Sequence, residues 1–455
     1  MTTVSNTDST GIGLLRDLGA SQAISIVIGV VIGSGIFLVP AEMMQAAGSA
    51  KLVFLAWIVG GVFSFCGAVT YAELGKLKPQ AGGEYVYIRD AFGALPGFLC
   101  GWTWTVVVKP GSLAAISTGV VRILGSFGAL SFMVERSGRL TIPGMLVAIA
   151  FVAFISVVNY VGIRRAGNFQ LAFTVLKIGL IIGIACLAFT STGSWSHFHQ
   201  TYSGSTAGFT GFVAAVTAAL WAFDGWSDLN MVAEEVKNPE RNLPIALIGG
   251  LLGIAALYLL VNAAVQFALA PSQIAASASP MSDAVGHSAL GMGAAVVVAV
   301  AMVVALTATL NGVAMSGSRI TFALARDGNF FRFLSRVHPR FRTPHMAILV
   351  QGVLSVCFLL IGGSFRQLFT LALFAEWLSY TAAAVALFVF LTRGLLPPGQ
   401  RKMWKTILAP ALFIVASGGL LYYTVISNLR YSALGSLAIL LGVPVYYAFA
   451  LRHRV

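Results

Sequence analysis

The stretch Gly33-Ser34-Gly35 interrupts the first long apolar segment of the chain, which runs over residues 20–44. Glycine loses more backbone entropy on folding than any other residue, so two glycines that flank a serine disfavour a continuous helix. Inside a lipid bilayer, irregular backbone is tolerated only where protein buries it or where it lines a cavity. The stretch therefore predicts an unwound segment beside a binding site in the middle of the membrane.

Composition places the chain among polytopic membrane proteins of the all-α class. Of its 455 residues, 58% are hydrophobic and only 9% are charged, and the mean hydropathy is +0.88. Apolar segments of about 20 residues, enough to cross about 30 Å of hydrocarbon as helix, recur along the chain. Twelve spans are predicted, near 20–44, 52–75, 94–121, 142–160, 169–190, 209–233, 244–270, 289–318, 345–363, 367–391, 406–425 and 432–451.

The loop charges predict the orientation of these spans. With the N-terminus inside, 20 of the 28 Lys and Arg residues fall in cytoplasmic segments and 6 fall outside, while Lys109 and Lys177 lie within spans. This asymmetry follows the positive-inside rule. Residues 1–19 lack the pattern of a cleavable signal, so we expect a cytoplasmic tail, a cytoplasmic C-terminus and a multi-pass protein of the plasma membrane.

The same charge distribution argues against nucleic acid as a partner, although the net charge is +13. Positive residues gather where the anionic cytoplasmic leaflet would lie, which indicates contact with the lipid bilayer. The four cysteines lie in apolar segments without paired spacing, so neither a metal site nor a disulfide-linked accessory subunit is expected. His197 and His199 have no further ligands nearby, and no cofactor is predicted.

A second interrupted span appears in the sixth segment, where Asp224-Gly225 cuts the apolar run that contains Trp221. Breaks in the first and sixth spans are typical of an inverted repeat of five plus five helices, as in the fold of the sodium-coupled transporter LeuT. The core then covers residues 20–391, with repeats at about 20–190 and 209–391, and residues 392–455 add two helices and a short tail. Half-helix ends offer amides to a carboxylate and carbonyls to an ammonium, which suits an amino acid.

Several motifs together resemble the amino acid, polyamine and organocation transporter superfamily, and within it the L-type amino acid transporter-like branch. The resemblance extends over essentially all twelve spans. Its most distinctive part is the cytoplasmic run EEVKNPERNLPIAL. The motifs are GSGIF at 33–37, PQAGGEYVY at 79–87, Lys109-Pro110, WAFDGW at 221–226 and EEVKNPERNLPIAL at 234–247.

The resemblance implies a substrate site made mainly of backbone. The substrate carboxylate would meet the amides around Ser34, Gly35 and Ile36, and its amino group would meet carbonyls near Ile32 and over 221–223. Trp221 would close over the substrate. The alternative interpretation is that the glycines only allow close helix packing and that the aromatic residues only pack. The predicted binding residues are Ile32, Gly33, Ser34, Gly35, Ile36, Trp221, Ala222, Phe223, Asp224 and Gly225.

Ionisable residues within spans are costly, about 2.5 to 3.5 kcal/mol each, and so indicate function. By the resemblance, Lys177 lies against the broken first helix, near the sodium site of sodium-coupled relatives, and would replace that cation. Lys109 is assigned to gating or coupling, or to exposed carbonyls near Pro110. Asp224 is expected to cap the second half-helix, with proton or cation binding as alternatives. Glu235 and Arg241 are candidates for a cytoplasmic ion-pair network.

Three classes of function are compared. The leading hypothesis is a secondary active transporter or exchanger of small or neutral amino acids that works by alternating access without sodium. A proton-coupled symporter, or an exchanger of cationic amino acids or polyamines, is the alternative. A channel would need a continuous polar pore, and a membrane enzyme would need a cluster of catalytic groups; the sequence shows neither.

Overall fold

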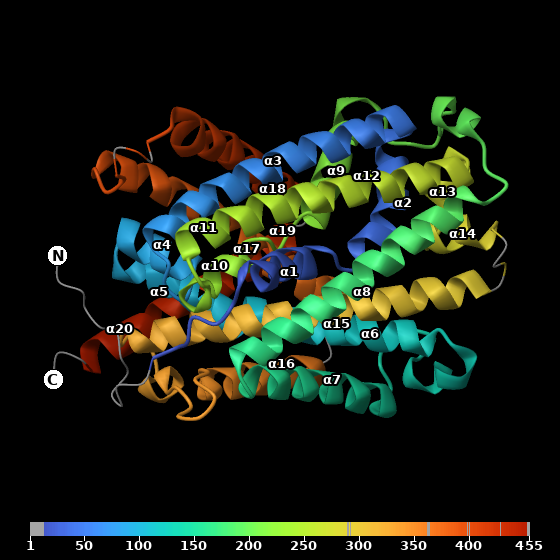
Figure 1. Ribbon diagram of the computed structural model, residues 1–455. Helices are drawn as coiled ribbons and strands as arrows, with labels where there is room; N and C mark the ends of the chain where they lie inside the picture. Colours follow the sequence, from blue (N-terminus) through green and yellow to red (C-terminus); the bar gives the residue numbers. More distant parts are fainter. Residues whose placement is uncertain are drawn as a thin grey trace.

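The computed structural model describes residues 13–288, 291, 293–361, 365–397, 399, 401–427 and 429–452. Residues 1–12 of the expected N-terminal tail and 453–455 of the C-terminal one lie outside this part. Among the described residues there are helices and three isolated bridges but no strand. Figure 1 shows the long helices running roughly side by side as an elongated bundle.

Within the described residues, twenty α-helices follow one another, joined in places by short 3-10 and π-helical turns. They are α1 Ala20–Val31, α2 Gly35–Ala47, α3 Ala50–Leu77, α4 Glu84–Phe92, α5 Ala94–Thr103, α6 Lys109–Gly125, α7 Ile142–Tyr160, α8 Ile163–Phe189, α9 Gly208–Ala222, α10 Asp228–Met231, α11 Pro239–Pro244, α12 Gly250–Ala268, α13 Pro271–Ala276, α14 Pro280–Gly286, α15 Gly293–Arg326, α16 His345–Ile361, α17 Phe365–Thr392, α18 Ala409–Ser427, α19 Leu429–Leu440 and α20 Gly442–Arg452. Turns of π-helix cover Trp104–Val108, Ile245–Gly249 and Trp404–Leu408, and 3-10 turns cover Gly128–Met133, Trp195–His199, Ala233–Glu235 and Arg332–Ser335.

Local sequence explains several helix starts. The Ser49 side chain accepts a hydrogen bond from the Leu52 amide at the start of α3, and Thr141 does the same for Gly144 at the start of α7. Such caps satisfy amides that have no partner in the preceding turn. Prolines occupy the first turn of α7, α11, α13 and α14, where a missing amide hydrogen has no cost.

Within the described residues, nine helices are long and apolar enough to cross a membrane. The pair α1 and α2 passes the same test together and is bent by 44° at its break. Two shorter apolar helices, α9 and α16, fall where the sixth and ninth spans are predicted. The all-helical membrane architecture expected from composition is therefore confirmed.

The two broken elements lie in the interior of the bundle. Helix α1 packs against α8, α12 and α15, while α9 packs against α2 and α3 and α10 contacts α1 and α15. In Figure 1, α1 and α10 are seen between the layer of α3 and α12 and the layer of α15 and α6. Long helices thus surround the two broken segments. At membrane depth, backbone without helical hydrogen bonds must be buried in protein or line a cavity.

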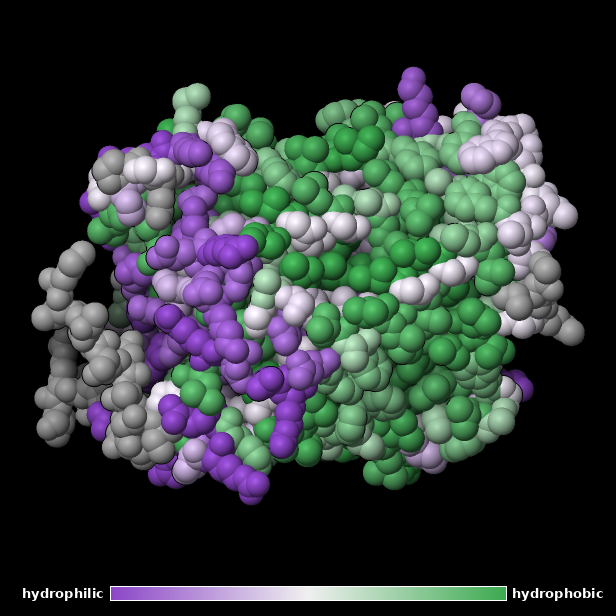
Figure 2. Space-filling model, viewed as in Figure 1, coloured by the Kyte–Doolittle hydropathy of each residue, from purple (hydrophilic) through white to green (hydrophobic). Residues whose placement is uncertain are grey.

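Hydrophilic surface gathers at one end of the bundle, which we call the polar end. It is formed by α4, α11 and the C-terminal end of α15, and it carries Lys78, Arg89 and Arg326. In Figure 2, purple residues crowd the left end, where α4 and α11 lie in Figure 1, and apolar green surface covers most of the remaining length. This distribution is what a bundle embedded in lipid would show, with its basic loops on one side.

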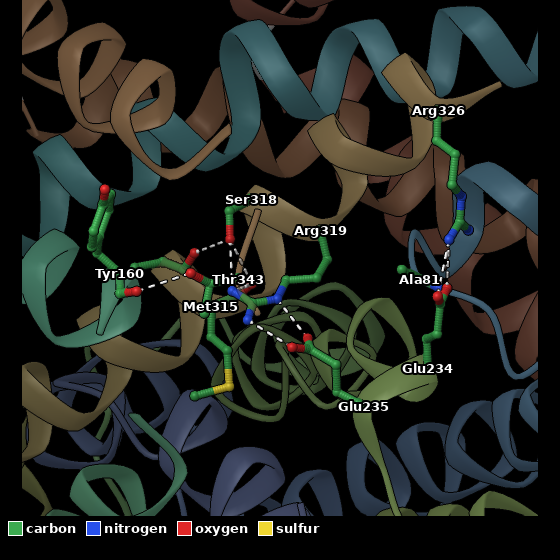
Figure 3. Close-up of polar contacts among 10 residues, drawn as sticks. Ala81, Tyr160, Glu234, Glu235, Met315, Ser318, Arg319, Arg326 and Thr343 are labelled. Atoms are coloured by element: carbon green, nitrogen blue, oxygen red, sulfur yellow. Dashed lines mark hydrogen bonds and ion pairs between the residues drawn. The ribbon is translucent and has the colours of Figure 1, made fainter. Parts of the chain in front are cut away.

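Figure 3 shows two of the ion pairs near the polar end. The Arg319 guanidinium donates two hydrogen bonds to Glu235, at 2.7 and 3.0 Å, and both side chains are fully buried. Arg326 pairs with Glu234 at 2.9 Å, and the same carboxylate accepts a hydrogen bond from the Ala81 amide at 3.0 Å. Glu235 thus joins the expected network, but its partner is Arg319, distant in sequence, rather than the neighbouring Arg241.

The backbone before α1 also attaches to this region. The amides of Asp17 and Leu18 both donate to the Glu235 carbonyl, at 2.9 and 3.0 Å, and the Lys237 amide donates to the Leu18 carbonyl at 2.8 Å. The entry to the first broken helix is therefore fastened to the segment that leaves the second.

Replacement of Arg319 by methionine should strongly destabilise the protein, because Glu235 would remain as a buried charge without its partner. Removal of one partner from a buried pair costs about 3 to 5 kcal/mol. Asp17→Asn is the control, since Asp17 pairs with Lys237 in a half-exposed position and such pairs contribute about 0 to 1 kcal/mol. Thermal unfolding in detergent, followed by tryptophan fluorescence, measures both. Equal midpoints for the two variants would contradict the assignment.

Candidate functional site

A cavity of about 130 Å³ lies between the two helix breaks. Both breaks contribute to its wall, and α6, α15 and α17 complete it. The lining residues are Val30, Val31, Gly33, Ser34, Gly35, Lys109, Ser112, Ile116, Trp221, Ala222, Asp224, Gly225, Asp228, Leu306, Thr309, Val313 and Glu376.

The first break presents a helix N-terminus to the cavity. Helix α1 ends at Val31 and α2 begins at Gly35, so Ile32 to Ser34 form the unwound link. The first amides of a helix have no carbonyl partner in the preceding turn, and they carry the positive end of the helix dipole. Because Ser34 and Gly35 line the cavity, an anionic group there would meet their amides, whereas the Gly33 amide already donates to the Val31 carbonyl at 2.9 Å.

The second break depends on a glycine. Helix α9 ends at Ala222, and Gly225 adopts a φ of +105° in the following turn. A Cβ atom at Gly225 would lie only 2.7 Å from a methyl group of Val30, on the other broken element. The close approach of the two breaks therefore requires glycine here.

Asp224 does not cap the second half-helix, so that expectation is wrong. Its carboxylate accepts a hydrogen bond from the adjacent Gly225 amide at 2.9 Å, and α10 begins only at Asp228, without a side-chain cap. The second half of the sixth segment is also short, because α10 covers four residues and is followed by a 3-10 turn. The Asp224 carboxylate instead remains at the cavity wall.

Tyr258 of α12 links the two breaks directly. Its hydroxyl lies 2.8 Å from the Ala222 carbonyl and 3.3 Å from the Val31 carbonyl, which are the last helical residues before each break. Phe223 packs against Tyr258 and Trp57, and the Trp221 ring lies beside Gly35. The aromatic residues around the sixth segment thus divide into a packing residue, Phe223, and a cavity residue, Trp221.

Most of the predicted site residues lie together at the cavity, but Ile32, Ile36, Phe223 and Lys177 do not line it. Gly33, Ser34, Gly35, Trp221, Ala222, Asp224 and Gly225 are in the wall, as is Lys109. Ile32, Ile36 and Phe223 are buried behind it. Their large side chains belong to the apolar core of the bundle.

Lys177 lies behind the first break rather than at the cavity. Its ammonium donates hydrogen bonds to the carbonyls of Gly29 and Ile32, at 2.8 and 2.6 Å, and the side chain is fully buried. Thr309 adds a hydroxyl bond to the Gly29 carbonyl at 3.1 Å. These carbonyls belong to the C-terminal end of α1, where a cation interacts favourably with the helix dipole. Lys177 thus supplies the partner that the unwound carbonyls lack.

The cavity holds one cation and three carboxylic side chains among the described residues. Lys109 pairs with Asp228 at 2.5 Å, and Ser316 donates to the same carboxylate at 2.7 Å. Asp224 and Glu376 face the cavity without a basic partner, although the Tyr380 hydroxyl donates to Glu376 at 2.8 Å. No group of three metal-ligating side chains occurs in the described part of the chain.

Sequence reasoning gave no role to Asp228 and no partner to Glu376. Glu376 is an isolated acid in an apolar segment, and that isolation was the available signal; Asp228 follows Asp224 by four residues in the sixth segment. A π-helical turn over Trp104–Val108 directly precedes Lys109 and shifts the register of the helix that carries it. Such turns inside helices often mark functional sites. Only the packed structure shows that Lys109 and Asp228 meet.

These features define a class of protein: a polytopic helical membrane transporter with a central cavity between two broken helices. The chain belongs to the amino acid permease family, whose model matches residues 18–449. It is 31% identical to the serine/threonine exchanger SteT of Bacillus subtilis over 447 residues, 97% of this chain and 98% of the relative. The human b(0,+)-type amino acid transporter 1 is 30% identical, covering 96% and 88% of the two chains. The cystine/glutamate transporter of Pongo abelii is also 30% identical, covering 96% and 85%.

Gly225→Ala should destabilise the protein, because alanine would be strained at this φ and would collide with Val30. Backbone strain of this kind costs about 1 to 3 kcal/mol. Gly179→Ala in α8 is the matched control, since a Cβ there meets nothing within 4 Å and alanine favours helix. The midpoint of thermal unfolding should fall for the first variant only. An unchanged midpoint for Gly225→Ala would show that the second break tolerates a side chain.

Proposed function

We propose that this protein is a secondary active transporter of amino acids that works by alternating access. The observation that carries the proposal is the cavity where α2 presents its N-terminal amides opposite the carbonyl end of α9. An α-amino acid has an anionic and a cationic group on one carbon, and a site of this kind suits both. Relatives named as exchangers support transport by exchange.

The proposed architecture has twelve spans with cytoplasmic termini in the plasma membrane. Nine long helices, the bent pair and the two shorter apolar helices would supply these spans. The breaks after α1 and α9 support two inverted repeats, at about 20–190 and 209–391, with residues 392–455 as an addition. The basic polar end, with Lys78, Arg89 and Arg326, would face the cytoplasm under the positive-inside rule.

The proposed transport cycle does not use sodium. The Lys177 ammonium already bonds the carbonyls of Gly29 and Ile32, so a fixed positive charge stands where a bound cation would otherwise stabilise the break. Trp221, beside Gly35, is the proposed lid over the substrate. The four cysteines lie within helices α3, α5, α8 and α16, which supports function without a disulfide-linked partner.

Small or neutral amino acids are the proposed substrates. The cavity of about 130 Å³ is close to the ~150 Å³ of a cavity that holds benzene, so it has room for a small side chain. A second candidate is a cationic amino acid or polyamine, with or without proton coupling. Asp224 and Glu376 favour it, because neither carboxyl group at the cavity has a basic partner among the described residues.

Counterflow in proteoliposomes tests the proposal. Vesicles loaded with a mixture of unlabelled amino acids should accumulate external labelled substrate, and empty vesicles should not if the protein is an exchanger. A panel of serine, threonine, alanine, leucine, glutamate and arginine separates neutral from charged substrates. Replacement of sodium by potassium should leave uptake unchanged. Absence of uptake of any amino acid in the panel would refute the proposal.

Lys177→Ala should reduce exchange at least tenfold, since the carbonyls at the end of α1 would lose their cation. The break would then hold the α2 amides less firmly in the geometry that the substrate needs. Lys51→Ala, at the exposed start of α3, is the control and should keep normal exchange. Initial rates of counterflow measure both variants. If Lys177→Ala kept the substrate affinity and the exchange rate of the wild type, Lys177 would have no role in coupling.

A further inference from the structure

An apolar groove runs between α7 and α16 on the outside of the bundle, away from the proposed amino acid site. The two helices pack against each other along one edge of the molecule (Figure 1), and the groove between them has a volume of about 380 Å³. Val157 and Val353 line it with side chains that are 60% and 63% exposed. The small residues Ala153, Ser156 and Gly352 leave room between the helices, and the Ser156 hydroxyl donates to a carbonyl of its own helix at 2.8 Å. The groove therefore offers an apolar surface on the face that lipid would cover.

The groove lies in one half of the membrane thickness. On α7 it extends from Val152 to Tyr160, the last residue of that helix, and on α16 it extends from Leu349 to Cys357. A rise of 1.5 Å per residue gives this stretch a length of about 12 Å, which is less than half of the ~30 Å hydrocarbon core. Because it begins where α7 ends, its mouth opens near the membrane surface. These dimensions suit the acyl chain of a lipid from one leaflet.

The loop between α15 and α16 packs around the mouth of the groove. The Thr343 hydroxyl donates to the Tyr160 carbonyl at 2.9 Å. The rings of His338, Phe341 and His345 lie 5.3, 5.9 and 6.1 Å from the Tyr160 ring. This loop follows the C-terminal end of α15, so the mouth lies on the side of the polar end. The contacts fix the loop against the helix that lines the groove.

Three arginines surround this mouth. Arg336 lies beside the His345 ring, and the Arg340 guanidinium lies 5.5 Å from the centroid of the Phe341 ring. Arg165, in the first turn of α8, lies 3.5 Å from a carbonyl in the turn that follows α7. All three side chains are exposed. Each salt bridge among the described residues involves other side chains, so these guanidinium groups have no anionic partner there.

The chain supplies no acid near this cluster from its own elements. Residues 136–223 and 328–375 contain no aspartate and no glutamate, and these ranges include α7, α8, α16 and the loops at the mouth. An anion that neutralises the arginines must therefore come from outside these segments. Guanidinium groups bind phosphate with paired hydrogen bonds. A ligand with a phosphate at one end and a hydrocarbon chain at the other matches both the arginines and the groove.

A second copy of the chain would fit the groove less well. In a two-fold dimer the same surface of each copy meets itself, so the arginines of both mouths would lie close together. Such an arrangement brings like charges together without an acid from these segments between them. A water-soluble phosphate would meet the arginines but would leave the apolar groove empty. The charge and the shape of this face together favour a lipid.

We propose that the groove between α7 and α16 binds one anionic phospholipid from the leaflet at the polar end. One acyl chain lies between Ser156 and Gly352, and the phosphate meets Arg165, Arg336 and Arg340. The lipid joins α7 to α16, and because it binds only the folded protein it raises the stability of the fold. The inference does not rest on the proposed amino acid transport.

Native mass spectrometry tests the headgroup. Protein freed of lipid in detergent is given equal amounts of phosphatidylglycerol and phosphatidylethanolamine with identical acyl chains. The wild type should retain phosphatidylglycerol at least tenfold more strongly. A double variant, Arg336→Gln with Arg340→Gln, should lose about fivefold of this preference for each arginine, because a basic residue near the membrane surface contributes about 1 kcal/mol toward anionic lipid. Lys402→Gln, an exposed cation outside the groove, is the control and should keep the preference.

Thermal unfolding tests the groove itself. Phosphatidylglycerol should raise the unfolding midpoint of the wild type, and glycerol phosphate, which has no acyl chain, should not. Gly352→Leu should lose this rise, since a Cβ atom there lies 3.1 Å from the Ser156 hydroxyl and the side chain would fill the groove. Gly183→Leu on the exposed face of α8 is the matched control, because its Cβ meets nothing within 4 Å. The arginine double variant serves if Gly352→Leu does not fold.

Three results would overturn the proposal. Equal retention of the two phospholipids by the wild type would show that the arginines do not select the headgroup. An undiminished rise of the midpoint in Gly352→Leu would place the lipid elsewhere. A dimer in the lipid-free wild type that Gly352→Leu abolishes would identify the groove as an interface between copies of this chain.

Discussion

Backbone groups at the ends of two interrupted helices are the constraint on which the rest of this structure depends. In hydrocarbon, each unsatisfied amide or carbonyl costs several kcal/mol. The carbonyls at the end of α1 are satisfied by Lys177 and Thr309, and the last carbonyl of α9 is satisfied by Tyr258. The amides that open α2 face a cavity instead. The site is thus the place where the protein leaves backbone donors available to a ligand.

Side chains from distant helices donate the hydrogen bonds to these backbone carbonyls. They explain why their helices pack against α1. Lys177 comes from α8, Thr309 from α15 and Tyr258 from α12, the three long helices that pack against α1. Gln170 and Thr174 extend the same pattern by donating to the Ser25 carbonyl within α1, at 3.3 and 3.1 Å. The helices that surround the break are therefore also its hydrogen-bond partners, and a shift of one changes the support of the break.

Buried charges follow a related rule in this molecule. Lys109 with Asp228, and Arg319 with Glu235, are pairs within the bundle that also receive or make further hydrogen bonds. Such pairs tolerate burial only when their partners remain in place, so they fix the relative positions of α6, α10 and α15. Asp224, Glu376 and Glu84 lack a basic partner among the described residues.

The sequence by itself determined the helical membrane class, the positions of both breaks and eight of the seventeen residues that line the cavity. Gly33-Ser34-Gly35 and Asp224-Gly225 carry this information locally, because glycine propensity and hydrophobic length act over a few residues. Tertiary structure decided which charges meet. Glu235 pairs with Arg319 rather than the nearby Arg241, and Asp228 meets Lys109 across more than a hundred residues. It also turned Ile32, Ile36 and Phe223 away from the cavity. Pairing and side-chain direction depend on which helices pack together, which no local pattern specifies.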